Sequence, residues 1–215
     1  MKRLLVVGAG GLGREAMDVA RVLEPGAGWR IVGFLDDRPG VLEGKSAGYP
    51  LVGNPDTYQP GDDDLFVCAV GDPATRRSYV EALERRGATF AQLLHPESDI
   101  SPSARIGRGV VALKYARVGP DAKVGEFTCI GYASGVAHDV VVGRFCQISG
   151  HCSVNGRACL EDEVSLGAHA VVLPDVVVGR GATVGAGSVA VRNVPPGCTV
   201  FGLPATVLSP ARRKA

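Results

Sequence analysis

From residue 100 to about residue 195 the chain places an apolar residue at every sixth position. Sixteen consecutive positions, counted in sixes from Ile100, are apolar with no insertion, and the residue four after each is Ala, Val, Thr, Ser or Cys. The apolar positions are Ile100, Ile106, Ala112, Val118, Val124, Ile130, Val136, Val142, Ile148, Val154, Leu160, Leu166, Val172, Val178, Val184 and Ala190. An unbroken six-residue period is typical of a hexapeptide parallel β-helix.

Strand geometry explains the period. Residues two apart on a strand share a face, so the small fifth residue of each hexad and the aliphatic residue that opens the next both point inward. The second to fourth places then form a corner. Glycine, which holds the second place in half of the hexads, is expected there because it tolerates backbone angles that other residues resist. Three hexads close a triangular coil, so this stretch predicts roughly five stacked coils.

The first 95 residues follow a different pattern, in which short apolar runs alternate with amphipathic segments. The predicted strands are 4–7, 29–35, 65–70 and 90–94, and the predicted helices are 14–23 and 74–86. This alternation predicts a small parallel sheet wound with helices, that is, a Rossmann-like α/β domain. The expected domains are therefore 1–95 and 96–215.

A glycine-rich loop, residues 8–13, separates the first predicted strand from the first helix. Glycines let the backbone approach a phosphate, and the free N–H groups at the start of the helix attract anions. Asp36 and Asp37 end the second strand, where a carboxylate can hold a ribose or a base, and Gly71 ends the third. We expect a nucleotide-containing ligand here. A full dinucleotide cofactor is not expected, because it normally requires a larger sheet.

Composition excludes several classes of protein. The net charge is +1, so neither a nucleic acid nor a membrane surface is expected as a partner. The apolar run before Gly8 is too short for the core of a signal peptide, and no stretch reaches transmembrane length. Six cysteines show neither metal-site nor disulfide-scaffold spacing, and Cys146 and Cys152 take small inward places, where buried thiols are expected. These features predict a cytoplasmic protein.

Three of the four histidines fall on predicted corners of the β-helix. His138 is the third residue of its hexad and precedes Asp139, a pairing suited to general base catalysis. The alternative is an exposed pair without a role. His151 and His169 are 18 residues apart, which is one coil, so we expect their rings to stack at the surface; a metal site is the alternative, but the ligand-rich pattern it requires is missing. His95 is expected to pack at the join between the domains.

Several short motifs, in order along nearly the whole chain, are similar to one known family. They are residues 7–15, 34–37, 69–72 with Arg76, 95–96, 100–104, 137–143, 194–197 and 202–205. The chain resembles the bacterial nucleotide-sugar acetyltransferases of the left-handed β-helix class. That class includes sialic acid O-acetyltransferase-like proteins and N-acetyltransferases acting on nucleotide-linked 4-amino sugars.

The resemblance implies a left-handed β-helix with a carboxyl-terminal cap, a homotrimer, and acetyl-CoA as cosubstrate in the groove between neighbouring prisms. It implies that His138 is the general base and that Asp139 supports the imidazolium. The implied cofactor-binding residues are Gly156, Ala168, Ala186, Gly202 and Pro204. The implied site for a UDP- or dTDP-linked sugar comprises Gly8, Gly10, Gly11, Leu12, Gly13, Asp36, Asp37, Gly71 and Arg76. No metal is implied.

Three residues depart from the family pattern. Leu12 stands where family members often have His, Gly131 where many have Asn, and Gln147 where some have His. The resemblance puts all three around the acceptor sugar, so they bear on which sugar is used. We expect acetyl transfer to an amino group of a nucleotide-linked sugar. Three alternatives stay open: transfer to a sugar hydroxyl, a non-catalytic nucleotide-sugar scaffold, and a metal hydratase of the β-helix type.

Overall fold

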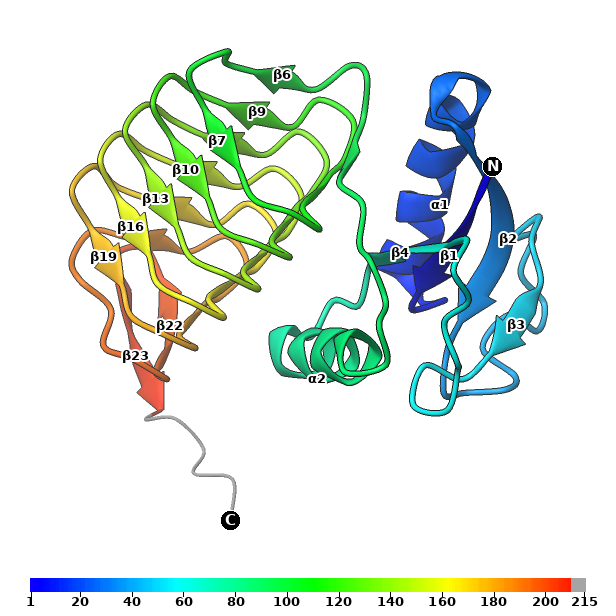
Figure 1. Ribbon diagram of the computed structural model, residues 1–215. Coiled ribbons are helices and arrows are strands. Elements are labelled where there is room, and N and C mark those ends of the chain that lie inside the picture. The colour runs from blue at the N-terminus through cyan, green and yellow to red at the C-terminus, as the bar shows by residue number, and fades with distance from the viewer. Residues whose placement is uncertain (210–215) are drawn as a thin grey trace.

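The computed structural model describes residues 1–209, which form an α/β part followed by a long β-helix (Figure 1). The α/β part holds one parallel sheet with strand order β3-β2-β1-β4. Its elements are β1 (Lys2–Val7), α1 (Gly11–Leu23), the short 3-10 helix η1 (Glu24–Gly26), β2 (Trp29–Leu35), β3 (Leu51–Gly53), β4 (Asp64–Cys68) and α2 (Pro73–Glu84). The predicted Rossmann-like architecture is confirmed.

The local sequence accounts for these elements. The four residues Leu4 to Val7 are fully buried, as the central strand of a sheet covered on both sides requires. Helix α2 begins where Asp72 accepts a hydrogen bond from the Thr75 N–H at 2.8 Å, with Pro73 in the first turn. An Asp cap followed by Pro is a strong helix start, because both suit the unpaired N–H groups of the first turn.

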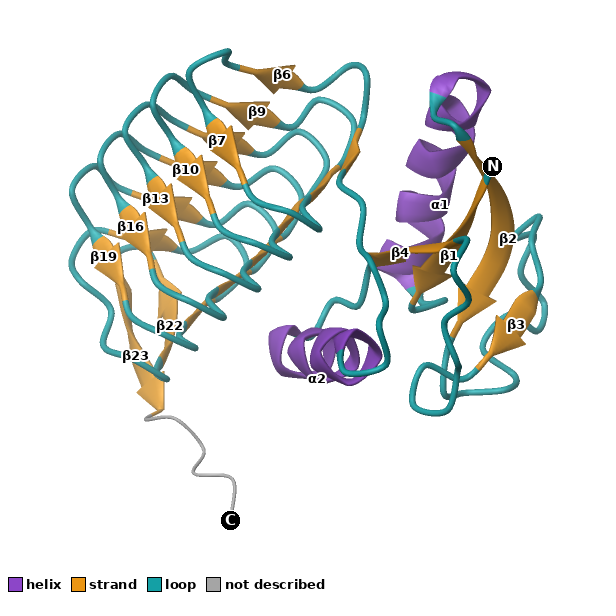
Figure 2. Cartoon of the chain, viewed as in Figure 1, coloured by secondary structure: helices purple, strands orange, loops and turns teal. Residues whose placement is uncertain are grey.

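The β-helix is built from two-residue strands joined by four-residue corners (Figure 2). Its three parallel sheets define three faces of a triangular prism, which we call faces I, II and III. Face I consists of β5 (Leu93–Leu94), β8 (Val111–Ala112), β11 (Cys129–Ile130), β14 (Gln147–Ile148), β17 (Ser165–Leu166), β20 (Thr183–Val184), β22 (Thr199–Gly202) and β23 (Ala205–Ser209), of which β23 alone pairs antiparallel. Face II consists of β6 (Asp99–Ile100), β9 (Arg117–Val118), β12 (Gly135–Val136), β15 (Ser153–Val154), β18 (Val171–Val172) and β21 (Val189–Ala190). Face III consists of β7 (Arg105–Ile106), β10 (Lys123–Val124), β13 (Val141–Val142), β16 (Cys159–Leu160) and β19 (Val177–Val178).

The predicted register of the repeat is confirmed. The small residue at the fifth place of each hexad is buried from Val110 to Val194, and only Ala104 in the first coil is partly exposed. Cys146 and Cys152 take such inward places, and burial raises the pKa of the Cys146 thiol to about 12. These cysteines therefore act as small core side chains.

The reason expected for the corner glycines is wrong. The backbone turns through positive φ at the fourth place of the hexads, which is held mainly by residues other than glycine, such as Asp139 at 59°. The glycines at the second place are needed for another reason, because a Cβ there would strike the backbone of the next coil. At Gly125 it would stand 2.5 Å from the carbonyl carbon of Gly143. Close stacking of coils, not unusual φ, selects glycine at this place.

The predicted strand 90–94 is divided between the two parts of the chain. Phe90 forms an isolated bridge with Phe66 beside the α/β sheet, but Leu93–Leu94 pairs with β8 on face I. Leu94 lies six residues before Ile100, so the repeat begins one hexad earlier than expected. The short strand β3, whose three residues carry no clear alternation, was not predicted.

The α/β part lies beside the β-helix, with α1 and α2 nearest to it (Figure 1). It packs on face I and reaches both edges of that face: Arg77 of α2 pairs with Glu163 at one edge, and Val19 of α1 and Tyr132 line one cavity at the other. The outward side chains of Val111 and Cys129 on face I belong to the same buried cluster as Leu4 and Ala16. A second contact is polar: the fully buried guanidinium of Arg76 in α2 donates to Gln147 of β14. Among residues 1–209, no helix is long and apolar enough to cross a bilayer.

Candidate functional site

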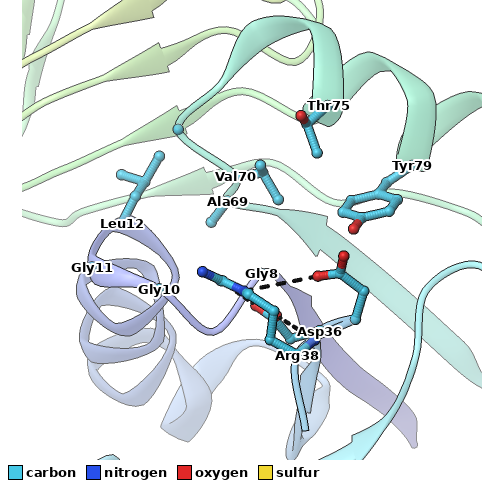
Figure 3. Close-up of a pocket in the computed structure, with 12 residues that line it drawn as sticks. Gly8, Gly10, Gly11, Leu12, Asp36, Arg38, Ala69, Val70, Thr75 and Tyr79 are labelled. Carbon is cyan, nitrogen blue, oxygen red and sulfur yellow. Dashed lines mark hydrogen bonds and ion pairs between the residues drawn. The ribbon is translucent and has the colours of Figure 1, made fainter. Parts of the chain in front are cut away.

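The glycine loop, the end of β2 and the end of β4 surround a pocket of about 440 Å³ (Figure 3). Of the residues predicted to bind the nucleotide sugar, the pocket brings together Gly8, Gly10, Gly11, Leu12, Asp36, Asp37 and Gly71. Ala69, Val70, Arg38, Thr75 and Tyr79 complete its lining. Because the carboxyl ends of parallel strands meet at one edge of a sheet, this is the expected place for a nucleotide.

Asp36 organises one wall of this pocket. Its carboxylate accepts the Ala9 N–H at 2.7 Å, and it pairs with the Arg38 guanidinium through two hydrogen bonds of 2.8 and 2.9 Å. Burial by itself would raise the pKa of Asp36, but Arg38 and the Ala9 N–H together hold that pKa below its usual value. The carboxylate therefore stays ionised and ties the glycine loop to β2.

Tyr79 faces the pocket from α2, across from the glycine loop (Figure 3). Burial, and then the negative charge of Asp37, raise the pKa of Tyr79 to about 12, so its hydroxyl stays protonated and can donate. Sequence analysis missed Arg38, Thr75 and Tyr79. Thr75 and Tyr79 are four residues apart, so they share one face of the helix that follows Gly71. Because Gly71 was expected at the site, the sequence could have predicted that this helix face lines the pocket.

Two residues predicted for this site lie elsewhere. A Cβ on Gly13 would stand 1.9 Å from the Gly8 carbonyl oxygen, so Gly13 permits the helix to pack against the loop and does not line the pocket. Arg76 is fully buried, and it donates to the carbonyls of Val70, Phe145 and Cys146 as well as to Gln147. Both Nη atoms donate to the protein, and Arg76 does not line the pocket, so the structure does not bring Arg76 together with the other predicted residues.

A smaller cavity of about 180 Å³ adjoins the nucleotide pocket and shares Leu12 with it. Its other lining residues are Glu15 from α1 and Leu113, Gly131, Tyr132, Gln147, Ser149 and Gly150 from the β-helix. The three residues that depart from the family pattern, Leu12, Gly131 and Gln147, thus line one cavity. It opens at the edge between faces I and II, which we call corner I/II.

His138 stands at the corner between faces II and III, which we call corner II/III. Its Nδ1 lies 2.8 Å from Oδ2 of Asp139, and both side chains are about half exposed. A carboxylate can only accept, so Nδ1 carries the proton and Nε2 presents a lone pair to solvent. The pair thus has the tautomer that a general base requires.

Gly156 lies one coil further along the same corner, directly against the imidazole. A Cβ on Gly156 would stand 2.6 Å from Cε1 and 2.7 Å from Nε2 of His138. Within residues 1–209, the Gly156 N–H donates to no protein acceptor. This N–H is therefore available beside the His138 imidazole, as an oxyanion donor must be.

The other predicted cofactor residues lie at other places on the prism. Ala168 and Ala186 are exposed on corner I/II, one coil apart, whereas Gly156 is on corner II/III. Gly202 and Pro204 lie in the β22–β23 hairpin at the carboxyl-terminal end of the β-helix. One chain therefore carries the predicted cofactor residues on two separate corners and one end.

The remaining histidines have well-defined surroundings. His151 and His169 stack on corner I/II with ring centroids 4.8 Å apart and planes 4° apart, which confirms the predicted stacking. Their ring nitrogens lie in parallel planes and do not converge. Among residues 1–209, no group of three or more metal-ligating side chains is found. His95 is buried at the join, where its Nδ1 accepts the Glu97 N–H at 3.0 Å, as its predicted structural role requires.

Comparisons with known proteins match both parts of the chain. The model of the PglD N-terminal domain family matches residues 3–83. GDP-perosamine N-acetyltransferase from Escherichia coli O157:H7 is 29% identical over 210 residues, which cover 93% of each chain. The acetyltransferase domain of PglB from Neisseria gonorrhoeae FA1090 is 32% identical, with a TM-score of 0.88 over 97% of this chain and 100% of that domain. PerB from Caulobacter crescentus, solved with CoA and GDP-perosamine, is 25% identical with a TM-score of 0.87 over 97% and 98% of the chains.

The full-length likeness covers the nucleotide pocket and the β-helix together, and it defines the protein as an acyltransferase of the hexapeptide-repeat class. Within that class, the chain belongs to the bacterial nucleotide-sugar acetyltransferases, whose β-helix is left-handed.

Proposed function

We propose that this protein transfers the acetyl group of acetyl-CoA to an amino group of a nucleotide-linked sugar. The observation that carries the proposal is the His138–Asp139 pair, held over Gly156 on the same fold that carries a nucleotide pocket. The relatives support it: one is a GDP-perosamine N-acetyltransferase, and the PglB domain has been solved with acetyl coenzyme A.

His138 is the general base in the proposed reaction. The amine nitrogen attacks the thioester carbonyl carbon, and Nε2 of His138 takes the proton that the nitrogen loses. The tetrahedral oxyanion accepts the Gly156 N–H, after which the C–S bond breaks and the imidazolium returns the proton to the CoA thiolate. Asp139 stabilises the imidazolium through its hydrogen bond to Nδ1, which is 2.8 Å long.

The geometry of the prism favours a site shared between chains. The α/β part covers face I, and corner II/III is the one corner of a triangle that face I does not touch. The nucleotide pocket and His138 of one chain therefore lie on opposite sides of the β-helix. We propose a homotrimer in which corner II/III of one prism approaches corner I/II of the next, so that His138 reaches the cavity lined by Gly131 and Ser149 of its neighbour.

The same arrangement unites the cofactor residues. Ala168 and Ala186 of one prism and Gly156 of the next would line a single groove for the pantetheine of acetyl-CoA, with the adenine near Gly202 and Pro204. We place the reaction in the cytoplasm, where acetyl-CoA and nucleotide-linked sugars are made. The nucleotide itself is proposed to occupy the pocket beside Asp36 and Tyr79.

A thiol-release assay tests the reaction. Acetyl-CoA would be combined with a panel of nucleotide-linked amino sugars and neutral sugars, using wild type and His138→Ala side by side. We expect turnover with an amino sugar and a decrease in kcat of about 10²-fold or more in the variant, with acetyl-CoA affinity unchanged. Turnover only with neutral sugars would indicate the hydroxyl alternative. Wild-type rates in His138→Ala would remove this residue from the mechanism.

Mixed oligomers test the shared site. Gly71 has open space around it, so Gly71→Glu puts a carboxylate into the nucleotide pocket without displacing the backbone and should block binding by repelling phosphates. Gly71→Glu and His138→Ala should each be inactive alone. When the two variants are co-expressed under different tags, their mixed oligomers should recover part of the activity. Some sites then combine an intact nucleotide pocket from one chain with an intact His138 from the other. No recovery in purified mixed oligomers would mean that each site belongs to one chain.

A further inference from the structure

The cavity beside the nucleotide pocket contains one charged side chain in its lining, Glu15. Leu12, Leu113, Gly131 and Gly150 offer no polar side-chain atom to a sugar. Tyr132, Ser149 and Gln147 are neutral, and the Gln147 Oε1 already accepts from Arg76 at 2.9 Å. The electrostatic character of the cavity therefore depends on Glu15.

The Glu15 carboxylate is not committed to another group. Its side chain is exposed, and within residues 1–209 it forms no hydrogen bond or ion pair. The neighbouring carboxylate on the helix differs: Asp18 lies 3.8 Å from Arg21 and does not line the cavity of Gly131 and Gln147. Asp18 lines only the adjoining cavity with Val19 and Val22, whereas Glu15 lies at the wall of both cavities. A carboxylate without a protein partner at the wall of a cavity is available to pair with a cation.

The helix directs Glu15 to this position. Leu12 and Glu15 are three apart, so they share the face of α1 that looks onto corner I/II. Ala16, Met17 and Ala20 are buried on the adjoining side of the same helix, so Glu15 stands at the border between its buried and exposed sides. Leu12 lines both cavities, so a sugar linked to a nucleotide in the larger pocket would have the smaller cavity, and Glu15 in its wall, directly beside it.

We propose that Glu15 selects an amino sugar as the acceptor, by pairing its carboxylate with the protonated amino group of the nucleotide-linked sugar. This inference rests on the proposed function and deepens it. An alkyl amine is largely protonated near neutral pH, so it gains a charge-assisted hydrogen bond that a sugar hydroxyl cannot match. The ammonium group releases one proton to solvent before the neutral amine attacks, so Glu15 acts in binding and positioning rather than in the chemical step.

Glu15→Gln tests the proposal, with Asp18→Asn as the matched control one turn along α1. Gln keeps the shape and removes the charge. We expect the KM for the amino-sugar substrate to rise about 10-fold in Glu15→Gln, with kcat within about 3-fold of wild type. Asp18→Asn should leave both constants unchanged. Equal effects of the two substitutions, or no effect of Glu15→Gln, would overturn the proposal.

A neutral ligand separates charge recognition from a general loss of binding. The same nucleotide linked to the corresponding hydroxy sugar should inhibit wild type and Glu15→Gln with the same inhibition constant. If Glu15→Gln loses as much affinity for the neutral ligand as for the amino-sugar substrate, the proposal is overturned, because Glu15 would then not distinguish the ammonium group from a hydroxyl. If wild type turns over no amino sugar, the proposed function fails. Calorimetric binding of the amino-sugar nucleotide to wild type and Glu15→Gln still decides whether Glu15 recognises the ammonium group.

Discussion

The imidazole of His138 rests directly on the backbone of Gly156, so that a Cβ added to Gly156 would stand 2.6 Å from the imidazole Cε1. Real Cβ atoms essentially never show so short a contact, and the three heavy atoms nearest to that Cβ all belong to the imidazole. A side chain at residue 156 would therefore move the imidazole of His138, the proposed general base, and leave the β-helix intact.

We predict that Gly156→Ala lowers kcat by about 10-fold or more, because a displacement of about 1 Å is enough to misalign a catalytic group. The thermal unfolding midpoint should stay close to that of wild type, since Gly156 does not have a positive φ. Gly26→Ala is the control, because a Cβ there meets nothing within 4 Å. Steady-state kinetics and thermal unfolding check both statements, and an unchanged kcat in Gly156→Ala would contradict the first.

Asp36 should make stability depend on pH. Its pKa is lower in the folded protein than in the unfolded chain, so its contribution is fully present above the unfolded value, about 3.9, and is lost as the pH falls through the folded value. We predict that Asp36→Asn is less stable than wild type at pH 7, and that the difference shrinks below about pH 4.

Denaturant unfolding of both proteins between pH 7 and pH 3 measures this difference. Asp56→Asn serves as a control, because Asp56 is exposed and its side chain forms no ion pair within residues 1–209. If the difference in the free energy of unfolding between wild type and Asp36→Asn stays constant across this range, the charge of Asp36 contributes nothing to stability.

Arg76 is expected to hold the α/β part on the β-helix. Arg76→Ala would leave the buried carbonyls of Phe145 and Cys146 without their guanidinium donor, at a cost of about 3 kcal/mol. The adjacent Arg77 pairs with Glu163 at 3.3 Å near the surface, so Arg77→Ala should cost about 0.5 kcal/mol. Denaturant unfolding of the two variants compares these values directly. Equal losses would mean that the buried network is no stronger than a surface ion pair.

Removal of metal ions should leave activity unchanged. The rings of His151 and His169 lie face to face, with planes 4° apart, so their nitrogens do not point at a common ion. We predict that turnover measured after dialysis against a chelator equals turnover before it, and that added zinc has no activating effect. Activity that falls on chelation and returns with zinc would favour the metal hydratase alternative.

Much of the fold could be predicted because the repeat leaves little freedom. Side chains on a strand alternate between two faces, so a six-residue period from Ile100 to Ala190 determines which residues point inward and which form corners. The 18-residue coil follows, and with it the stacking of His151 on His169 and of His138 on Gly156. The glycine loop could likewise be placed, because strand, loop and helix occur in the order that a nucleotide site requires.

Contacts between distant segments could not be read from such local patterns. Arg76 lies in a helix at the mouth of the nucleotide pocket, and its sequence context does not reveal that its guanidinium crosses to Gln147, 71 residues away. Arg38 and Tyr79 line that pocket only because the end of β2 and the face of α2 converge on it. The prediction likewise placed Leu93 and Leu94 in the α/β sheet, although they pair with β8 on face I, because two apolar residues fit either sheet.

The sequence by itself determined a prism with a histidine on a corner and a nucleotide loop on a separate sheet. Only the tertiary structure decided which face of the prism the α/β part covers. That choice depends on contacts between side chains far apart in the chain, because Val111 and Cys129 pack with Leu4 and Ala16. The free energy gained by burying apolar surface depends on the area removed from water and not on the distance along the chain. It leaves His138 on the opposite side of the β-helix from its own nucleotide pocket, which is why a neighbouring chain enters the proposed mechanism.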